Sequence, residues 1–299
     1  MVWSATGADD APILVLGEAL VDIIVGDGDR RVIPGGSAAN VALGLARRGL
    51  PVRLATCLAD DEYGALVARS LVAEGVSVDA ASYTASRTST AIARRDDAGD
   101  VSYEFDVEWN LPELDPSAPL RAVHLGSFPA FSSDVDILTQ LLSTARDRAP
   151  TSWDPNVRPA LAPDREDAQR RFRALLGSIA LLKLSDADAE YLLPGLTPDG
   201  IADLALDAGA CSVVVTLASE GMLLATATGR VRVPAARTTV VDTIGAGDTV
   251  MCSLIADLVQ GRWPSTERLE AVGRRAAAAA AITVGRPGAD LPRAAELGL

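Results

Sequence analysis

The chain has 299 residues, of which 48% are hydrophobic, so it can bury a large core and does not have the composition of a disordered protein. Its formal net charge is −13 at pH 7, which argues against nucleic acid and anionic membrane surfaces as partners. Three widely spaced cysteines without metal or redox spacing, no signal-peptide pattern and no apolar run of membrane-spanning length predict a reduced, cytoplasmic protein.

The first strong pattern follows a lead-in at residues 1–12 that looks disordered, because charges and Pro12 interrupt its few apolar residues. Residues 13–16, Ile-Leu-Val-Leu, predict a buried strand. Asp22 comes shortly after this apolar stretch, where α/β folds place groups that bind ligands. From these residues alone, a turn aspartate is the simpler interpretation.

Residues 34–42, Pro-Gly-Gly-Ser-Ala-Ala-Asn-Val-Ala, predict a loop that becomes a helix, with its backbone close to another group. Asn40 then lies in the first turns, where its amide can both donate and accept hydrogen bonds. A capped helix without a ligand is the alternative. Residues 52–58 next predict a strand, and the acidic residues 60–62 suit the start of a helix.

Two strand-like runs, residues 90–95 and 101–105, flank a turn sequence and predict a β-hairpin. Together with residues 22–33 they interrupt the alternation of strands and helices. The only histidine, His124, lies in a buried-strand pattern. We assign it a structural role, because no nearby partner supports nucleophile or metal chemistry.

Two later strands end in polar residues. One predicted strand ends at Asp154, and Pro155 and Pro159 stiffen the loop that follows, which would hold its polar groups firmly at the sheet's carboxyl edge. Another strand carries Lys183 near its end, where a lysine is a suitable counter-charge for phosphate.

Residues 242–248, Asp-Thr-Ile-Gly-Ala-Gly-Asp, follow an extended β-branched run and precede an amphipathic helical run that stops before Gly261. Gly245 and Gly247 therefore lie where a loop becomes a helix, and they let an oxyanion approach unpaired backbone N–H groups. Asp248 in the same turn would repel a tightly held phosphate, but it is suited to take a proton from an attacking hydroxyl. Helix capping by Asp248 is an equally good interpretation from the physics alone.

Two of these stretches together resemble a known family. Residues 242–248 resemble the C-terminal signature of the ribokinase-like sugar kinases, the phosphofructokinase B family, and residues 35–42 resemble its N-terminal signature, Gly-Gly-x-x-x-Asn-x-Ala. The similarity runs from about residue 13 to 292. Repeated βα units fit the fold that it implies: a doubly wound, mostly parallel α/β sheet flanked by helices. The family implies one kinase domain over residues 1–299, with a small β-sheet lid from about residues 22–33 and 88–110.

The resemblance also implies roles in catalysis and sugar binding. In the family the final aspartate of the signature, here Asp248, is the general base, and the backbone of Gly245, Ala246 and Gly247 forms the anion hole. The residues implied to bind the sugar are Asp22, Gly36, Asn40, Tyr103 and Arg158. Packing within the lid is an equally good role for Tyr103, and a surface ion pair is nearly as good for Arg158.

ATP is the implied nucleotide. The residues implied to contact it are Asn156, Lys183, Ser185, Thr216, Gly221 and Gly247. Ala218 replaces a family glycine in the same region, so we expect a slightly different loop there.

Metal ions follow from the resemblance as well. The family acid that helps to hold Mg²⁺ through water matches Asp188, which is shorter than the usual glutamate, and Glu190 is the alternative. A monovalent cation such as K⁺ would be held by Asp242, Ile244, Thr283 and Gly288. Lid sheets in relatives sometimes pair, which makes a homodimer an expectation to test.

The predicted function is ATP-dependent transfer of the γ-phosphate to a primary hydroxyl of a small sugar. Fructose is favoured, because Gly-Glu-Ala-Leu-Val-Asp at residues 17–22 looks most like bacterial fructokinases, and ribose and 2-keto-3-deoxygluconate stay open as acceptors. A nucleoside kinase and a catalytically inactive sugar- or nucleotide-binding sensor also stay open as functions. The chain has no Gly-x-x-x-x-Gly-Lys-Ser/Thr motif, so it is not a P-loop enzyme, and no dinucleotide fingerprint follows its first strand.

Overall fold

The structure, a computed structural model, describes residues 10–26, 29–95, 101–115, 118–132, 134–162, 164–261 and 266–299. Within these ranges the main sheet has nine strands, in the order β13-β12-β11-β10-β9-β8-β1-β4-β5. In this sheet the strands β5, β4, β1, β8, β9, β10 and β11 are parallel to one another. The sheet continues with β12 and β13, which are each antiparallel to the preceding strand. In chain order they are β1 (Ile13–Leu16), β4 (Val52–Ala55), β5 (Val76–Val78), β8 (Ala122–Leu125), β9 (Thr151–Trp153), β10 (Leu181–Ser185), β11 (Ser212–Thr216), β12 (Met222–Thr226) and β13 (Gly229–Val233).

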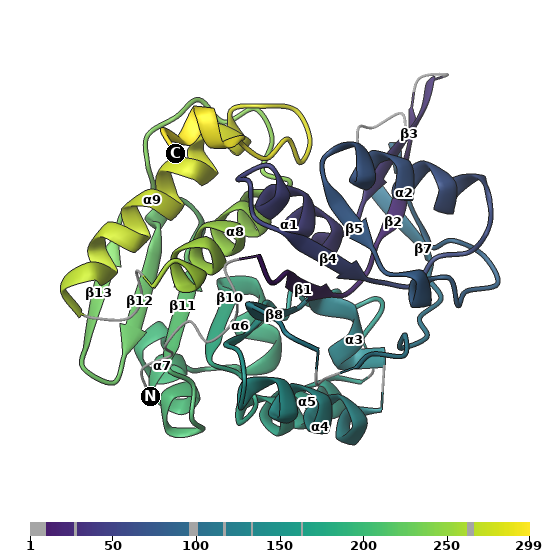
Figure 1. Cartoon of the computed structure of the whole chain (residues 1–299). Helices are drawn as coiled ribbons and strands as arrows, with labels where there is room; N and C mark the ends of the chain where they lie inside the picture. Colours follow the sequence, from purple (N-terminus) through teal and green to yellow (C-terminus); the bar gives the residue numbers. More distant parts are fainter. Residues whose placement is uncertain are drawn as a thin grey trace.

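Helices cover both faces of the main sheet (Figure 1). One face carries α1 (Ser37–Ala46), α2 (Glu62–Ala73), α8 (Ala246–Val259) and α9 (Thr266–Val284). The other carries α3 (Ser127–Ser132), α4 (Val135–Arg146), α5 (Arg165–Leu176), α6 (Asp186–Leu192) and α7 (Pro198–Asp207). Short 3₁₀ turns lie at Ala80–Ser82, Ala218–Glu220 and Ala294–Leu297. The expected doubly wound α/β fold is confirmed.

Burial along β1 shows why an uninterrupted apolar run forms the centre of this sheet. Ile13 and Val15 pack into the core under α1 and α8, while Leu14 and Leu16 pack into the core under α4 and α5. A strand covered on both faces needs apolar side chains at every position, so period-2 alternation is absent. Among the described helices, none combines the length and the apolar character that a membrane span requires.

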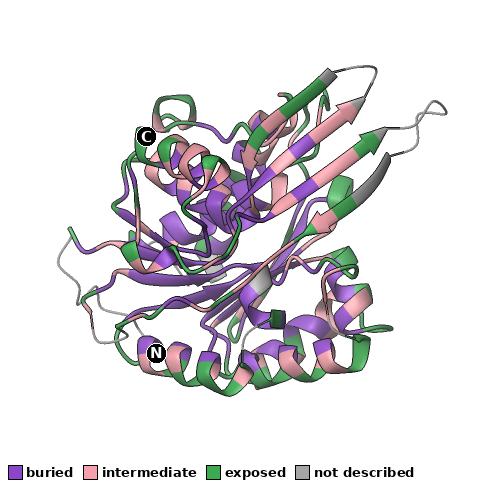
Figure 2. Cartoon of the chain, turned by 90° about the vertical axis from the view of Figure 1, so that its right-hand side faces the viewer, coloured by how far each residue is buried: buried purple, intermediate pink, exposed green. Residues whose placement is uncertain are grey.

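The second sheet has four strands in the described residues, in the order β3-β2-β6-β7. It consists of β2 (Leu20–Gly26), β3 (Asp29–Gly35), β6 (Thr90–Arg95) and β7 (Val101–Asp106). Figure 2 shows these strands projecting beyond the main body, with their buried residues close to it. The expected small sheet is confirmed, and the hairpin corresponds to the β6–β7 pair.

Asp22 lies within β2, paired with Ile33 and Ala91, as expected from the strand that the resemblance implies for residues 22–33. The extended β-branched run at residues 238–241 belongs to neither sheet. One local expectation needs correction: the alanine-rich helix was expected to end at Ile282 with a loop from Thr283, but Thr283 forms part of the last turn of α9. The positive φ expected after α8 is present, with Gly261 at φ +66°.

Candidate active site

The glycine-rich signature forms the entrance to α8, as the sequence predicted. Gly245 is the residue that precedes the helix and has φ +78°, a left-handed conformation that glycine adopts without strain. A Cβ at this position would lie 2.9 Å from the Cα of Ala289, so there is no room for a side chain. The helix begins at Ala246, whose N–H donates to the Thr243 carbonyl oxygen at 3.3 Å. The N–H groups of a first helical turn have no acceptor within the helix, which suits them to bind an anion.

Lys183 lies directly beside this helix entrance. A Cβ added to Gly247 would be 3.0 Å from the Lys183 Nζ, so the glycine permits the close approach of the ammonium. Lys183 is only 3% exposed, and its Nζ donates to Asp154 Oδ2 at 2.7 Å. Burial opposes its charge, but the carboxylates of Asp154, Asp188 and Asp248 raise the pKa of the lysine above its usual value. It is also the only lysine in the chain, a signal in the sequence that singles it out.

Asp248 joins the two glycine signatures. Its Oδ1 accepts a hydrogen bond from Ser37 Oγ at 2.7 Å, and its Oδ2 accepts one from Asn40 Nδ2 at 2.8 Å. Burial raises the pKa of this carboxyl, while the donors Ser37 and Asn40 and the positive charges of Lys183 and Arg158 oppose that rise. The carboxylate is therefore held by side chains and is not used as a simple helix cap; the residue that precedes the helix is Gly245.

The entrance to α1 has the opposite electrostatic character. Glu18 Oε1 accepts hydrogen bonds from the Ser37 backbone N–H at 3.0 Å and from Ser127 Oγ at 2.9 Å. Gly36 has φ +103°, and a Cβ there would lie 2.6 Å from the Glu18 carbonyl oxygen. A carboxylate thus occupies the N-terminus of α1, whereas the N-terminus of α8 has the Lys183 ammonium beside it as well as the Asp248 carboxylate in its first turn. An anionic phosphate is expected at α8, and an uncharged hydroxyl group suits the α1 side.

Sequence reasoning did not assign roles to Glu18, Ser37 or Asp154. Each is a single polar residue in a predicted loop, helix start or strand end, and its importance depends on a partner distant in the chain. Ser37 and Asp248 are 211 positions apart.

Asp22 and Arg158 approach the same region from different elements. Asp22 comes from β2, and a Cβ on Gly35 would lie 2.0 Å from its Oδ2, so the neighbouring strand leaves space for the carboxylate. Burial raises the pKa of Asp22 to about 6, and the positive charge of Arg158 opposes this. Arg158 Nη1 donates to Asn156 Oδ1 at 2.7 Å, and Asn156 has φ +39°, a conformation that asparagine tolerates better than most residues.

Burial of the ionised Asp22 carboxylate should lower the free energy of unfolding, and a substitution at Asp22 should reveal this effect. The folded pKa of about 6 lies above the usual 3.8, so the carboxyl costs stability as pH rises from 3.8 through 6. Asp22→Asn should therefore stabilise the protein at pH 8 by up to about 3 kcal/mol, and this gain should vanish near pH 4. Urea unfolding at both pH values measures it, with the exposed Asp60→Asn as the control. An equal gain at pH 4 would contradict the proposed cause.

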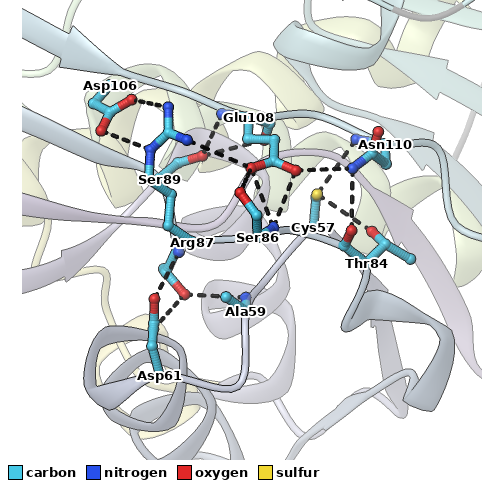
Figure 3. A network of polar contacts seen from close by, with 11 residues as sticks. Cys57, Ala59, Asp61, Thr84, Ser86, Arg87, Ser89, Asp106, Glu108 and Asn110 are labelled. Carbon is cyan, nitrogen blue, oxygen red and sulfur yellow. Dashed lines mark hydrogen bonds and ion pairs between the residues drawn. The ribbon is translucent and has the colours of Figure 1, made fainter.

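Polar contacts tie together the segments that enter β6 and leave β7 (Figure 3). The Glu108 carboxylate accepts from the backbone N–H and the hydroxyl of Ser86, and Arg87 forms two hydrogen bonds to Asp106. Asp61, at the start of α2, accepts from Thr88. The root of the small sheet is thus fastened to the main body. Tyr103 pairs through its backbone with Ala93, and its side chain lies outside the described part of the structure.

The predicted nucleotide residues lie at the ends of neighbouring strands. Ser185 ends β10 and stands opposite Thr216 in β11. After β11, Ala218 has φ +47° and Gly221 has φ +98°. Ala218 therefore has a backbone conformation that normally favours glycine, and the altered loop stays a prediction.

The predicted magnesium residues differ in their surroundings. Asp188 is 4% exposed and accepts hydrogen bonds from Ser185 and from the Val157 N–H, so it caps α6 and fixes the adjacent loop. Glu190 is exposed. Across the described ranges, no three acidic, histidine or cysteine side chains are grouped as a metal site.

The four residues predicted to hold a monovalent cation belong to adjacent loops and the end of α9. Asp242 accepts from the N–H groups of Ile244 at 3.0 Å and Gly288 at 2.8 Å. The Thr283 carbonyl accepts from the N–H of Arg286 at 3.0 Å, and its side chain is buried against Thr249. Binding of a cation there stays a prediction.

His124 is completely buried in β8, with Nδ1 3.1 Å from Ser152 Oγ. Burial lowers its pKa to about 3, with the charge of Lys183 acting in the same direction. The histidine is therefore neutral at physiological pH, in keeping with a structural role.

Comparisons with known proteins identify a family for the chain. A model described as pfkB family carbohydrate kinase matches residues 13–295. A fructokinase from Rhizobium leguminosarum bv. trifolii is 30% identical over 259 residues, which cover 82% of this chain and 79% of the relative. A 2-dehydro-3-deoxygluconokinase from Bacillus subtilis is 30% identical over 240 residues, covering 76% and 74%. The crystal structure of a fructokinase with bound ATP from Xylella fastidiosa aligns with a TM-score of 0.83 at 24% identity, covering 96% of this chain and 97% of that one.

The family match spans nearly the whole chain, and it includes both glycine signatures that meet at Asp248. The fold of the main and small sheets agrees with that of the solved relative. The chain therefore belongs to the pfkB family of carbohydrate kinases and is a sugar kinase.

Proposed function

We propose that this sugar kinase transfers the γ-phosphate of ATP to a primary hydroxyl of a small sugar, with fructose as its preferred acceptor and Asp248 as the general base. The observation that carries the proposal is the position of Asp248: it lies in the first turn of α8, held by Ser37 and Asn40 from α1. Lys183 adds a buried positive charge beside the same turn.

Different groups of the chain bind the two substrates. The N–H groups of Gly245, Ala246 and Gly247 hold the transferred phosphoryl group, and Lys183 offsets its charge. Asp22 and Asn40 hold the sugar hydroxyls, and the small sheet excludes water that would otherwise accept the phosphoryl group. Asp248 takes the proton from the attacking hydroxyl.

Mg²⁺ bound together with the nucleotide would neutralise the charge of its phosphates. Asp188 is the chain's candidate for a contact through water, and Asp242 for a monovalent cation.

Fructose is proposed because fructokinases are among the relatives at about 30% identity, and the ATP-bound structural relative is also a fructokinase. The B. subtilis relative makes 2-dehydro-3-deoxygluconate the main competitor, and ribose is a third candidate acceptor.

A panel of sugars with ATP and Mg²⁺ tests the proposal by comparing kcat/KM for fructose, ribose, 2-dehydro-3-deoxygluconate and adenosine. We expect fructose to give the highest value, with one phosphorylated product per ATP consumed. A higher value for another acceptor would replace fructose and leave the phosphoryl transfer intact. Binding of sugar and ATP without any ATP consumption would support the inactive sensor.

A further inference from the structure

We propose that Ser37 is a positioning residue for catalysis: its hydroxyl holds the Asp248 carboxylate in the orientation that receives the sugar proton. The inference rests on the proposed role of Asp248 as general base. It assigns a purpose to a position that the N-terminal signature leaves undefined, between its glycines and its asparagine.

Geometry supports this assignment. Ser37 Oγ lies 2.7 Å from Asp248 Oδ1, and Ser37 is only 9% exposed. Asn40 lies three residues later on α1, so both donors share one face of the helix. Each donates a hydrogen bond to a different oxygen of the Asp248 carboxylate. Each carboxylate oxygen has two acceptor sites, so a free site remains for the hydroxyl of a sugar.

Ser37 is itself held from the opposite side. Its backbone N–H donates to Glu18 Oε1 at 3.0 Å, and the same oxygen accepts from Ser127 Oγ at 2.9 Å. The start of α1 is thereby fixed between the loop after β1 and the start of α3. Because Ser37 is anchored through its backbone, its hydroxyl is free to face Asp248.

Several charged groups around Asp248 influence its pKa, and the hydrogen bond from Ser37 acts in addition to them. Lys183 and Arg158 favour the ionised carboxylate, while burial and the neighbouring carboxylate of Asp154 oppose it. Cys252, one turn along α8, is buried, and burial raises the pKa of its thiol to about 12, so it stays neutral. Ser37 and Asn40 are the side-chain donors in direct contact. Loss of a donor to a carboxylate raises its pKa, so the base form requires a higher pH.

The test is the pH dependence of kcat/KM, whose acidic limb reports the base in the free enzyme. Wild type, Ser37→Ala and Ser37→Thr are compared with ATP, Mg²⁺ and D-fructose, or the panel sugar with the highest kcat/KM. We expect Ser37→Ala to move the acidic limb upward by about one pH unit. Ser37→Thr, which keeps a hydroxyl, should return it toward the wild-type position.

Ser143→Ala is the matched control, because it also removes a serine hydroxyl that is hydrogen-bonded, here to Ser178 at 2.9 Å, but on α4. Its pH profile should coincide with that of wild type. If Ser37→Ala does not fold, Ser37→Cys provides the second measurement, since a thiol is a weaker donor of similar shape and should also shift the limb upward.

An acidic limb that stays in place in a folded Ser37→Ala or Ser37→Cys enzyme would overturn the role of Ser37. That result is separable from failure of the proposed function, which would appear as near-normal turnover in Asp248→Asn.

Discussion

Asp248→Asn should lower kcat roughly 10²–10⁴-fold, the range expected for loss of a positioned general base. The amide has nearly the same shape as the carboxyl group but cannot accept the proton. Its hydrogen bonds can be kept in part: the amide oxygen can accept from Asn40, and the amide nitrogen can donate to the Ser37 hydroxyl, which also accepts. Burial disfavours the native carboxylate, so the variant should remain folded.

Steady-state turnover and equilibrium ATP binding, measured separately, distinguish chemistry from binding. Asp257→Asn is the control on the same helix, because Asp257 pairs with Arg275 and stands near the far end of α8. It should keep turnover near that of wild type. Turnover of Asp248→Asn within about tenfold of wild type would show that another group accepts the proton.

Lys183→Met should destabilise the folded protein by about 3–5 kcal/mol, because it leaves the buried partner charge uncompensated. Asp154 is 1% exposed, and its Oδ2 accepts from the Lys183 Nζ at 2.7 Å. Its Oδ1 has no hydrogen-bond partner among the described residues. Without the ammonium, Asp154 must be protonated in the folded state or remain as an unpaired buried anion.

The loss of stability caused by Lys183→Met should increase with pH. Burial raises the pKa of Asp154 to about 6 against the usual 3.8, and Lys183 limits the rise. Removing Lys183 raises it further, so the extra cost grows as pH increases above about 6 and is smaller at pH 5. Urea unfolding at pH 5 and pH 8 measures both values.

Two comparisons separate the buried pair from a general effect of removing a cation. Arg274→Met breaks the exposed pair with Glu270 and should change stability by less than about 1 kcal/mol. Adding Asp154→Asn to Lys183→Met should recover much of the lost stability at pH 8. A Lys183→Met protein as stable as wild type at pH 8 would contradict the cost assigned to the pair.

Much of the fold was predictable because its signals are local. The apolar run at Ile13–Leu16 is the central strand β1, and Gly245 and Gly261 bracket α8 as expected. An error arose at the end of α9, where the sequence predicted a loop from Thr283 but the helix continues to Val284. The extended β-branched residues Val240 and Val241 belong to neither sheet and are more than half exposed. Propensity reports what a segment tolerates, and a neighbouring strand decides whether it becomes part of a sheet.

In the candidate site, too, the features that depend on local sequence were predictable, and those that depend on packing between distant segments were not. The family signatures singled out Asn40, Gly247 and Asp248 from local residue types and spacing, and the structure brings Asn40 and Asp248 into contact. The hydrogen bond from Ser37 to Asp248 and the pairing of Lys183 with Asp154 were not predictable, because each depends on how separate elements pack.

The buried position of Lys183 has a practical consequence, because the sequence contains no second lysine. Isotope labelling with lysine alone would give one side-chain ammonium resonance in a magnetic resonance spectrum, with no assignment problem. That single signal would report directly on the core beneath the glycine turn as nucleotide, acceptor or proton concentration is varied.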